Sequence, residues 1–544
     1  MWRQDADRNQ NVMVKTTDIG RPGTRLTDVS REPLAALPPP YDGSDSLPPR
    51  KRLSDQTIAN CDCSLDGFLA VGAARPKNEL EEQQLVERFL AGLERLLSAE
   101  DNWTFLQQLT LSLEHCARCQ TCVESCPIYV ASGRQEVYRP TFRSEIFRRT
   151  VNKYARLGGK ILARLRGEDV ELNGTTILRL LELSYRCTLC RRCAQACPMG
   201  VDNALLAREI RKLFSMELGI APKELHDRGS IVQLRVGSST GMNARAVKDN
   251  IEFLDEEIRE QTGLTIHTPW DKAGADVLLI HNAGEILSWP ENPMAFAIIL
   301  EAAGINWTMS SDLVGYDSVN YGVWYDDAQF ARVAIRQMEA AKRLGVKKIV
   351  LGECGHGHKA SMVVADRLLP SDLDIPRESA MPFLRDIVMS GRLKLDPARN
   401  AFPVTLHDPC NMVRMMGIVR PQRDILRAIC PEFREMTPYG VNNYCCGGGS
   451  GFAIMSSYNF EDWRSSIAGR MKLKQILEAF ADCPGPDIKK YVCAPCSNCK
   501  GQFRDLFAYY GVWEKSGILY GGLAELIVNA MSELQEPFIK WEFH

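Results

Sequence analysis

The sequence predicts an α+β protein of several domains, with an extended N-terminal arm, an all-helical domain and two α/β repeats. A chain of 544 residues exceeds what a single hydrophobic core usually serves. Apolar residues recur at helical spacing up to about residue 225, whereas short apolar runs alternate with helical segments after about residue 270. Most of the 19 cysteines fall in tight clusters inside these two regions.

The arm is predicted over residues 1–78. It is polar and rich in Pro, Asp and Arg, including Pro38-Pro39-Pro40. Such a composition buries too little apolar surface to offset the entropy of ordering, so we expect an extended or partner-ordered segment. Cys61 and Cys63, one residue apart, are expected to be bystanders rather than metal ligands.

The helical domain is predicted over residues 79–225. The run NELEEQQLVERFLAGLERLL places apolar residues three and four apart with charges between them. Two further helical runs, NWTFLQQLTLSLEHC and TILRLLELSYRC, each lead into a cysteine cluster. Residues 226–270 are expected to form a linker.

Alternating strands and helices are predicted after residue 270. The runs ADVLLIHNAG, KKIVLGECG, FPVTLHDPC and IKKYVCAPC have the pattern of buried strands followed by functional loops. Helical segments between them favour parallel sheets, whose sites lie at the carboxyl ends of the strands. VLLIHNAG resembles VTLHDPC, and VLGECGHGHKA resembles VCAPCSNCKGQ, which indicates a duplication with halves at 271–375 and 376–544.

Composition limits the function classes. A formal net charge of −2 gives no global signal for nucleic-acid binding, so no nucleic-acid partner is expected. No run reaches about 18 uninterrupted apolar residues, and the start of the chain lacks the apolar core of a signal peptide. We therefore expect a cytoplasmic protein, in which clustered cysteines more often bind metal than form disulfides.

Two cysteine motifs of identical spacing predict a pair of [4Fe–4S] cubane clusters. HCARCQTCVESCP and YRCTLCRRCAQACP both follow the pattern C-x2-C-x2-C-x3-C-P. One loop wraps three corners of a cube, and its last cysteine supplies the fourth corner of the other cube. The first cluster is thus assigned to Cys116, Cys119, Cys122 and Cys197, and the second to Cys187, Cys190, Cys193 and Cys126. The alternative, a pair of zinc sites, usually takes C-x2-C pairs without the third cysteine and the C-x3-C-P tail.

The second α/β half carries a further set of cysteines: Cys410 in HDPCN, Cys445 and Cys446 in CCG, and Cys496 and Cys499 in APCSNCK. This set resembles the CCG domain of heterodisulfide reductase-type proteins. The resemblance implies that the five thiolates bind a non-cubane [4Fe–4S] cluster at which disulfide chemistry occurs. An ordinary cube with one spare cysteine and a zinc site are the alternatives. The glycines after Cys446 are expected to leave room for the cluster, and Cys493 is expected to lie on the strand outside it.

The first α/β half keeps one cysteine of the set, Cys354 in GECGHGHK, so no cluster is predicted there. Cys354, His356 and His358 are candidates to line the cavity beside the other half's cluster, where the histidines could supply protons. The alternative is that they hydrogen-bond the loop backbone, and the same two options hold for His407. Cys430 and Cys483 are expected to be inert.

Two ferredoxin motifs followed by two CCG-type repeats resemble the D-type subunit of heterodisulfide reductase and DsrK over about residues 80–510. The resemblance implies the catalytic subunit of a DsrMKJOP-type complex, a thiol:disulfide oxidoreductase in dissimilatory sulfur metabolism. It implies a haem b membrane subunit linked to quinone, further complex subunits, and a small DsrC-like sulfur-carrier protein as substrate. The chain would then be peripheral on the inner face of the cytoplasmic membrane.

Two other hypotheses remain open. One is an electron-transfer iron–sulfur subunit of a flavin dehydrogenase of the glycolate or glycerol-3-phosphate type, and the other is a scaffold. No flavin or nicotinamide fingerprint appears, so electrons are expected to come from another subunit. The basic segment 143–166 is expected to be a solvated helical face, or else a contact for an acidic partner or the membrane surface.

Overall fold

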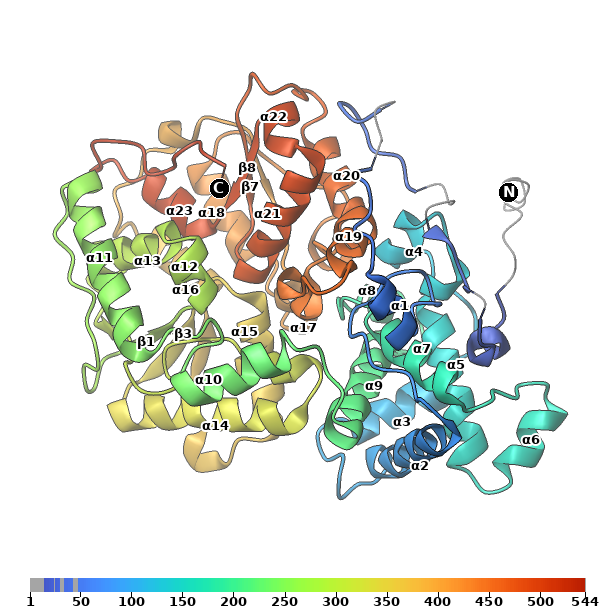
Figure 1. Cartoon of the computed structure of the whole chain (residues 1–544). Coiled ribbons are helices and arrows are strands. Elements are labelled where there is room, and N and C mark those ends of the chain that lie inside the picture. The colour runs from blue at the N-terminus through green and yellow to red at the C-terminus, as the bar shows by residue number, and fades with distance from the viewer. Residues whose placement is uncertain (1–13, 24, 30–33, 43–46, 544) are drawn as a thin grey trace.

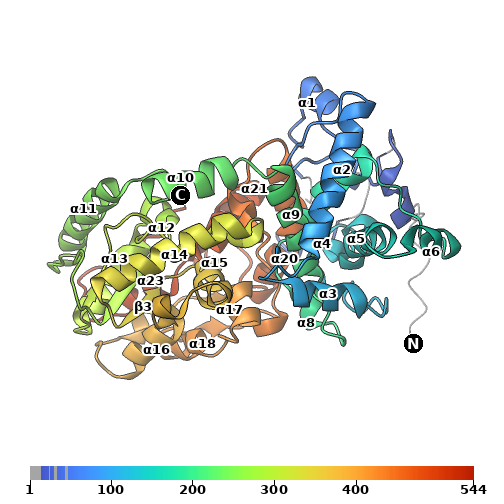
Figure 2. The same cartoon turned by 90° about the horizontal axis from the view of Figure 1, so that it is seen from below.

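The computed structural model describes residues 14–23, 25–29, 34–42 and 47–543. A helical unit forms one side of the molecule and an α/β body forms the other (Figure 1). The same division is visible from below, where the long helix α14 (Asp327–Leu344) runs across the α/β body (Figure 2). Among the described residues, no helix combines the length and apolar character needed to cross a membrane.

The helical unit is built around α9 (Asn203–Leu218), whose buried face packs against most of the other helices of the unit. Asp202 caps its start by accepting hydrogen bonds from the amides of Ala204 and Leu205. The other helices of the unit are α2 (Glu79–Leu96), α3 (Leu106–Glu114), α4 (Pro127–Ala131), α5 (Pro140–Tyr154), α6 (Gly159–Leu165), α7 (Gly174–Ser184) and α8 (Arg192–Gln195). The two cysteine loops lie before α4 and around α8, both of which are short.

The predicted linker at 226–270 is largely helical. It contains a π-helix at His226–Ser230, then α10 (Ile231–Val236) and α11 (Ala244–Thr262). α11 buries Val247, Ile251, Leu254 and Ile258 against α12 (Ala283–Ser288) and α13 (Glu291–Ala302). This spacing of three and four residues is an amphipathic helix signal, and the segment belongs to the first α/β half.

The α/β body contains two four-stranded parallel sheets with the same topology. The first has the order β2-β1-β3-β4, with strands β1 (Val277–Ile280), β2 (Trp307–Thr308), β3 (Lys348–Leu351) and β4 (Arg377–Ser379). The second has the order β6-β5-β7-β8, with strands β5 (Val404–Leu406), β6 (Phe433–Arg434), β7 (Lys490–Cys493) and β8 (Ile518–Gly521). The four predicted strands are present as β1, β3, β5 and β7. Because β4 follows residue 375, the first half extends beyond the boundary expected from sequence.

Helices that follow the strands position the loops of the site. In the first half these include α15 (Gly355–Lys359) and α16 (Ala380–Met389). In the second half they are α17 (Cys410–Met415), α18 (Pro421–Ile429), α19 (Phe460–Trp463), α20 (Arg470–Ala479), α21 (Ser497–Tyr510), α22 (Val512–Ser516) and α23 (Leu523–Asn529). β5 pairs in parallel with β7, so the residues that follow both strands emerge at the same edge of the sheet.

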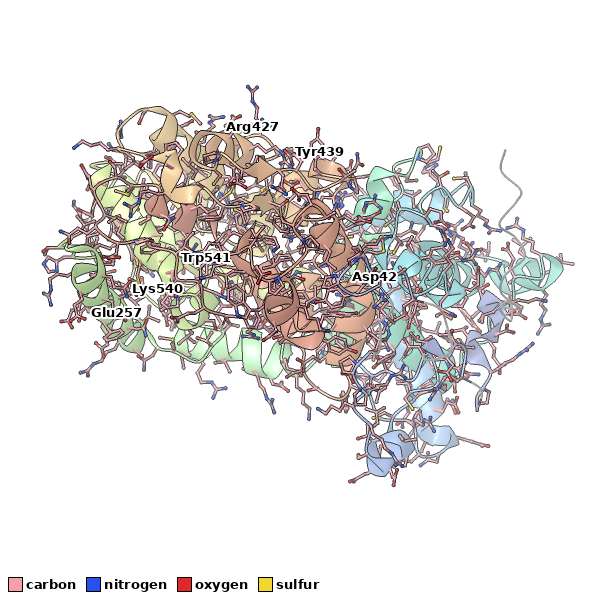
Figure 3. All side chains as sticks on the ribbon, turned by 90° about the horizontal axis from the view of Figure 1, so that it is seen from above. Asp42, Glu257, Arg427, Tyr439, Lys540 and Trp541 are labelled. Carbon is pink, nitrogen blue, oxygen red and sulfur yellow. The ribbon has the colours of Figure 1, made fainter. Side chains whose placement is uncertain are left out.

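The described parts of the N-terminal arm are anchored by buried side chains. They contain few regular elements, a 3-10 turn at Thr16–Gly20 and α1 (Asp55–Asn60). The carboxylate of Asp66 pairs with the Arg186 guanidinium at 2.6 Å in the core of the helical unit. Tyr41 donates a hydrogen bond to the carbonyl of Tyr510 at 3.2 Å, and Figure 3 places the neighbouring Asp42 where the helical unit meets the α/β body. The arm therefore spans both parts of the molecule.

Candidate metal centres

The first predicted thiol group lies close to the surface of the helical unit. Burial, followed by the nearby thiols of Cys197, Cys116 and Cys119, raises the pKa of Cys122 to about 11. The structure thus brings Cys197 of the second motif to three cysteines of the first. Cys119 is exposed, so this group is accessible to a partner.

The second predicted thiol group is more deeply placed. Burial, Asp202 and then the thiols of Cys187, Cys190 and Cys126 raise the pKa of Cys193. The structure therefore brings Cys126 of the first motif to the three cysteines of the second.

A buried cation faces the second thiol group. Arg143 of α5 is 1% exposed, and within the described residues its Nε and Nη1 atoms have no hydrogen-bond partner. Burial lowers the pKa of Arg143, but the four thiols, Cys187 first, raise it more. An unpaired guanidinium in a protein interior is costly unless negative charge lies opposite. An anionic iron–sulfur group held by these thiolates fits that requirement.

The thiols of the second α/β half form a continuous, buried series of contacts. Cys410 is within hydrogen-bonding reach of Cys445, and Cys445 of Cys446. The Cys446 Sγ atom lies 3.4 Å from that of Cys499, which in turn contacts Cys496. Five buried thiols gathered from three loops are a donor set suited to a metal group. Cys493, on β7, lies outside this series, as expected.

The glycines of the CCG loop serve backbone packing. Gly447 has φ +98°, and a Cβ there would lie 2.5 Å from the amide nitrogen of Gly469. A Cβ on Gly449 would lie 2.6 Å from the carbonyl oxygen of Thr188, in the loop of the second thiol group. These two positions let other backbone segments approach the CCG loop. That the glycines also leave room for a cluster stays a prediction.

The second thiol group and the CCG thiols touch each other. Cys190 is within hydrogen-bonding reach of Cys445. Arg414 of α17 holds the two loops together, donating from Nη1 to the carbonyl of Cys190 at 2.9 Å and from Nε to that of Val441 at 2.7 Å. The two motifs are far apart in the sequence, so no local signal could predict this contact.

Two polar side chains, Lys472 and His407, act on the CCG thiols. Lys472 of α20 has no motif in the sequence, and it donates to the side chains of Asn443 and Gln475. Burial lowers its pKa to about 7, although Asp408, Cys446 and Cys445 oppose the shift. His407 places Nε2 3.2 Å from the Cys499 Sγ atom, and burial holds its pKa well below the usual range. Neutral His407 can donate Nε2–H to that sulfur, so its contact is with a thiol and not with the loop backbone.

Cys354 of the first half joins the series through Cys496. Its Sγ atom accepts hydrogen bonds from the amide of Gly357 at 3.3 Å and from Asn282 Nδ2 at 3.4 Å. The His356 Nδ1 atom lies 3.9 Å away. The seven contacting thiols, called the thiol series, are Cys190, Cys410, Cys445, Cys446, Cys499, Cys496 and Cys354.

His358 does not reach the thiols. Its Nδ1 atom lies 2.7 Å from the carbonyl of Cys354, and its Nε2 atom lies 2.8 Å from the Ser379 hydroxyl. Burial also lowers the pKa of His358. The geometry therefore matches the backbone-binding alternative for this residue and gives its predicted proton supply no direct contact.

Comparison with protein-family models identifies two matching regions. The 4Fe-4S dicluster domain matches residues 112–201, and the cysteine-rich domain known as CCG matches residues 404–504. Together these regions contain every cysteine predicted as a cluster ligand, but they do not contain Cys354.

Curated relatives align with most of this chain. It is 26% identical over 493 residues to the Hdr-like menaquinol oxidoreductase iron-sulfur subunit 2 of Archaeoglobus fulgidus, covering 80% of this chain and 84% of that protein. It is 26% identical to the Hdr-like menaquinol oxidoreductase iron-sulfur subunit of Archaeoglobus profundus, covering 77% and 79%. It is 24% identical to the D-type subunit of the dihydromethanophenazine:CoB--CoM heterodisulfide reductase of Methanosarcina barkeri, covering 77% and 94%.

Proposed function

Since the chain belongs to the family of iron–sulfur oxidoreductases that includes DsrK and the D-type subunit of heterodisulfide reductase, we propose that it is the subunit at which electrons meet a disulfide or trisulfide. The observation that carries the proposal is the unbroken series of thiol contacts from Cys190 to Cys354. This series connects the helical unit to both α/β halves. A scaffold would not need such a series.

Three iron–sulfur groups are assigned in this proposal. One [4Fe–4S] cubane cluster is held by Cys116, Cys119, Cys122 and Cys197, and the second by Cys126, Cys187, Cys190 and Cys193. A non-cubane [4Fe–4S] cluster is held by Cys410, Cys445, Cys446, Cys496 and Cys499. When bound, these groups supply one-electron redox chemistry and iron that can bind substrate sulfur.

The protein's own residues set the conditions for that chemistry. Burial of the CCG thiols excludes water, and the amides of Gly447 and Gly448 donate to the sulfurs of Cys445 and Cys446 at 3.4 Å. We assign Cys354, at the end of the series away from Cys190, to the side of the site that meets the substrate. His356, close to Cys354, is the histidine we assign to proton transfer at that sulfur.

The exposed face of the helical unit is where we place the contact with a partner subunit. α6 projects from this unit (Figures 1 and 2) and exposes Ile161 and Leu165 beside basic residues. We propose that this face, near exposed Cys119, contacts a quinone-linked haem b membrane subunit, which places the chain on the inner face of the cytoplasmic membrane. The names of the archaeal relatives, menaquinol oxidoreductase subunits, support a quinol donor. A small DsrC-like sulfur carrier is the proposed substrate.

The test uses anaerobically reconstituted full-length protein carrying Cys445→Ser, with Cys483→Ser as the matched control because Cys483 lies outside the thiol series. Oxidation with a disulfide should give the wild type a paramagnetic signal distinct from those of reduced cubanes. Cys445→Ser should lose that signal and disulfide turnover while keeping the cubane signals. If signal and turnover both survive, the alternative of a pure electron carrier for a flavin dehydrogenase replaces the proposal.

A further inference from the structure

A cavity of about 160 Å³ lies where the three units of the protein meet. Arg191 and Arg208 line it from the helical unit, Lys359 and Arg367 from the first α/β half, and Met415 from the second. Binding cavities occur preferentially at such domain junctions. This one lies outside the set of ligand cysteines.

The lining is cationic, and one of its cations lacks a partner. Arg191 pairs with Asp202 at 2.7 Å, and Arg208 pairs with Asp327 and Glu209. Lys359 is only 8% exposed, and no described residue forms a hydrogen bond or ion pair with its ammonium group. Burial, followed by repulsion from Arg191 and Arg208, lowers the pKa of Lys359 to about 8. A buried ammonium in this setting is stabilised by an anion that enters the cavity.

Three of the segments that line the cavity each carry a member of the thiol series. Lys359 ends α15, the helix that Cys354 caps, and Met415 ends α17, which begins at Cys410. Arg191 follows Cys190 directly in the sequence. α15 and α17 also pack against each other. A ligand in the cavity is therefore beside the segments that position both ends of the thiol series.

We propose that this cavity binds a carboxylate of the sulfur substrate, with Lys359 as its ion-pair partner. The inference rests on the proposed function, because it assigns the ligand class of the same site. The cavity has room for one short carboxylate arm, and Arg367, which donates to the carbonyl of Thr104 at 2.8 Å, adds positive charge at its rim. The substrate class is a disulfide that carries a carboxylate a few atoms from sulfur.

The test separates binding from turnover. Calorimetry on reconstituted full-length protein uses suberate, a non-reducible analogue of 3,3′-dithiodipropionate, and the neutral 1,8-octanediol. Suberate should bind the wild type and bind Lys359→Gln at least about tenfold more weakly, the scale of one lost charged hydrogen bond. Lys359→Arg should restore binding, octanediol should not discriminate among the proteins, and exposed Lys272→Gln should match the wild type.

Turnover supplies the second readout. In Lys359→Gln the KM for 3,3′-dithiodipropionate should rise about tenfold, with that for neutral 2-hydroxyethyl disulfide unchanged. Suberate binding that is absent, or equal in wild type and Lys359→Gln, overturns the anion site even if disulfide turnover persists. Suberate binding that depends on Lys359, in a wild type that reduces no disulfide, supports the anion site and overturns the proposed function instead.

Discussion

Replacing Arg143 by Gln should lower the reduction potential of the proposed second cubane cluster. The guanidinium is 1% exposed, and its strongest electrostatic partners are the thiols of Cys187, Cys126, Cys193 and Cys190. Reduction adds negative charge opposite this cation, so removing the cation makes reduction less favourable. Arg143→Lys keeps the charge and should shift the potential much less.

The size of the shift follows from Coulomb's law. For an assumed separation of about 8 Å between the cation and the reduced group, the interaction is worth about 2 kcal/mol at an effective dielectric constant of about 20. For a one-electron couple, about 59 mV corresponds to a factor of ten in the equilibrium constant, or about 1.4 kcal/mol. Arg143→Gln should therefore lower the potential by about 90 mV.

The measurement is a potentiometric titration of the reconstituted protein followed by electron paramagnetic resonance. Exposed Arg166→Gln, in the same helical unit, controls for the loss of a distant positive charge. The cluster assigned to Cys116, Cys119, Cys122 and Cys197 should shift less than the second. A second-cluster potential that is unchanged, or that rises, would refute the role given to Arg143.

Three further predictions concern the α/β body. Gly449→Ala should slow electron transfer into the CCG group in stopped-flow experiments, because the added Cβ would lie 2.6 Å from the Thr188 carbonyl oxygen. Gly485→Ala, whose Cβ would lie in open space, should leave the rate unchanged. Equal rates in the two variants would contradict the packing role of Gly449. Arg423→Ala should lower the free energy of unfolding by about 3–5 kcal/mol, since it leaves buried Asp408 without its ion pair at 2.7 Å. Exposed Arg427→Ala, whose position Figure 3 labels at the edge of the molecule, should cost less than about 1 kcal/mol in the same denaturant titration, and similar losses would refute the comparison. Burial raises the pKa of Glu353 from 4.5 to about 8, so between these pH values the native state keeps a proton that the unfolded state releases. The free energy of unfolding should therefore fall by up to about 1.4 kcal/mol per pH unit between about pH 4.5 and 8. A Glu353→Gln protein with the same pH dependence would count against this assignment.

The strands that could be predicted from sequence are those with an uninterrupted apolar run ending at a loop signal. β1, β3, β5 and β7 meet this condition, and they are the central strands of the two sheets. β2 and β6 contain two residues each, too short for any periodicity to register. The sheets are completed by tertiary contacts that no local pattern encodes.

The N-terminal arm also has tertiary contacts that its sequence could not predict. Its polar composition predicts an extended segment, and the described parts do contain little regular structure. Composition could not reveal that Asp66 pairs with Arg186 inside the helical unit, because the partner is distant in the sequence. Specific buried ion pairs of this kind are invisible to average hydrophobicity.

The cysteines that the structure brings together could be predicted as a group from sequence, because fixed spacing reflects the geometry of a cluster-binding loop. The charged groups around these cysteines could not be predicted from sequence. Arg143 and Lys472 come from helices without a cysteine motif, and Lys359 ends the GECGHGHK run. Their roles follow only from burial beside thiols or other cations. His358 is the opposite case: its motif predicted a role beside the thiols, but its side chain contacts the backbone of its own loop.

Anomalous diffraction at the iron edge, from crystals of the full-length protein grown without oxygen, shows directly what the CCG thiols hold. We expect a third iron group bound by Cys410, Cys445, Cys446, Cys496 and Cys499, next to the second cubane cluster at Cys190. Zinc at these cysteines, an ordinary four-ligand cube, or thiols that hold no metal while both cubanes are loaded would contradict the proposed site of disulfide chemistry.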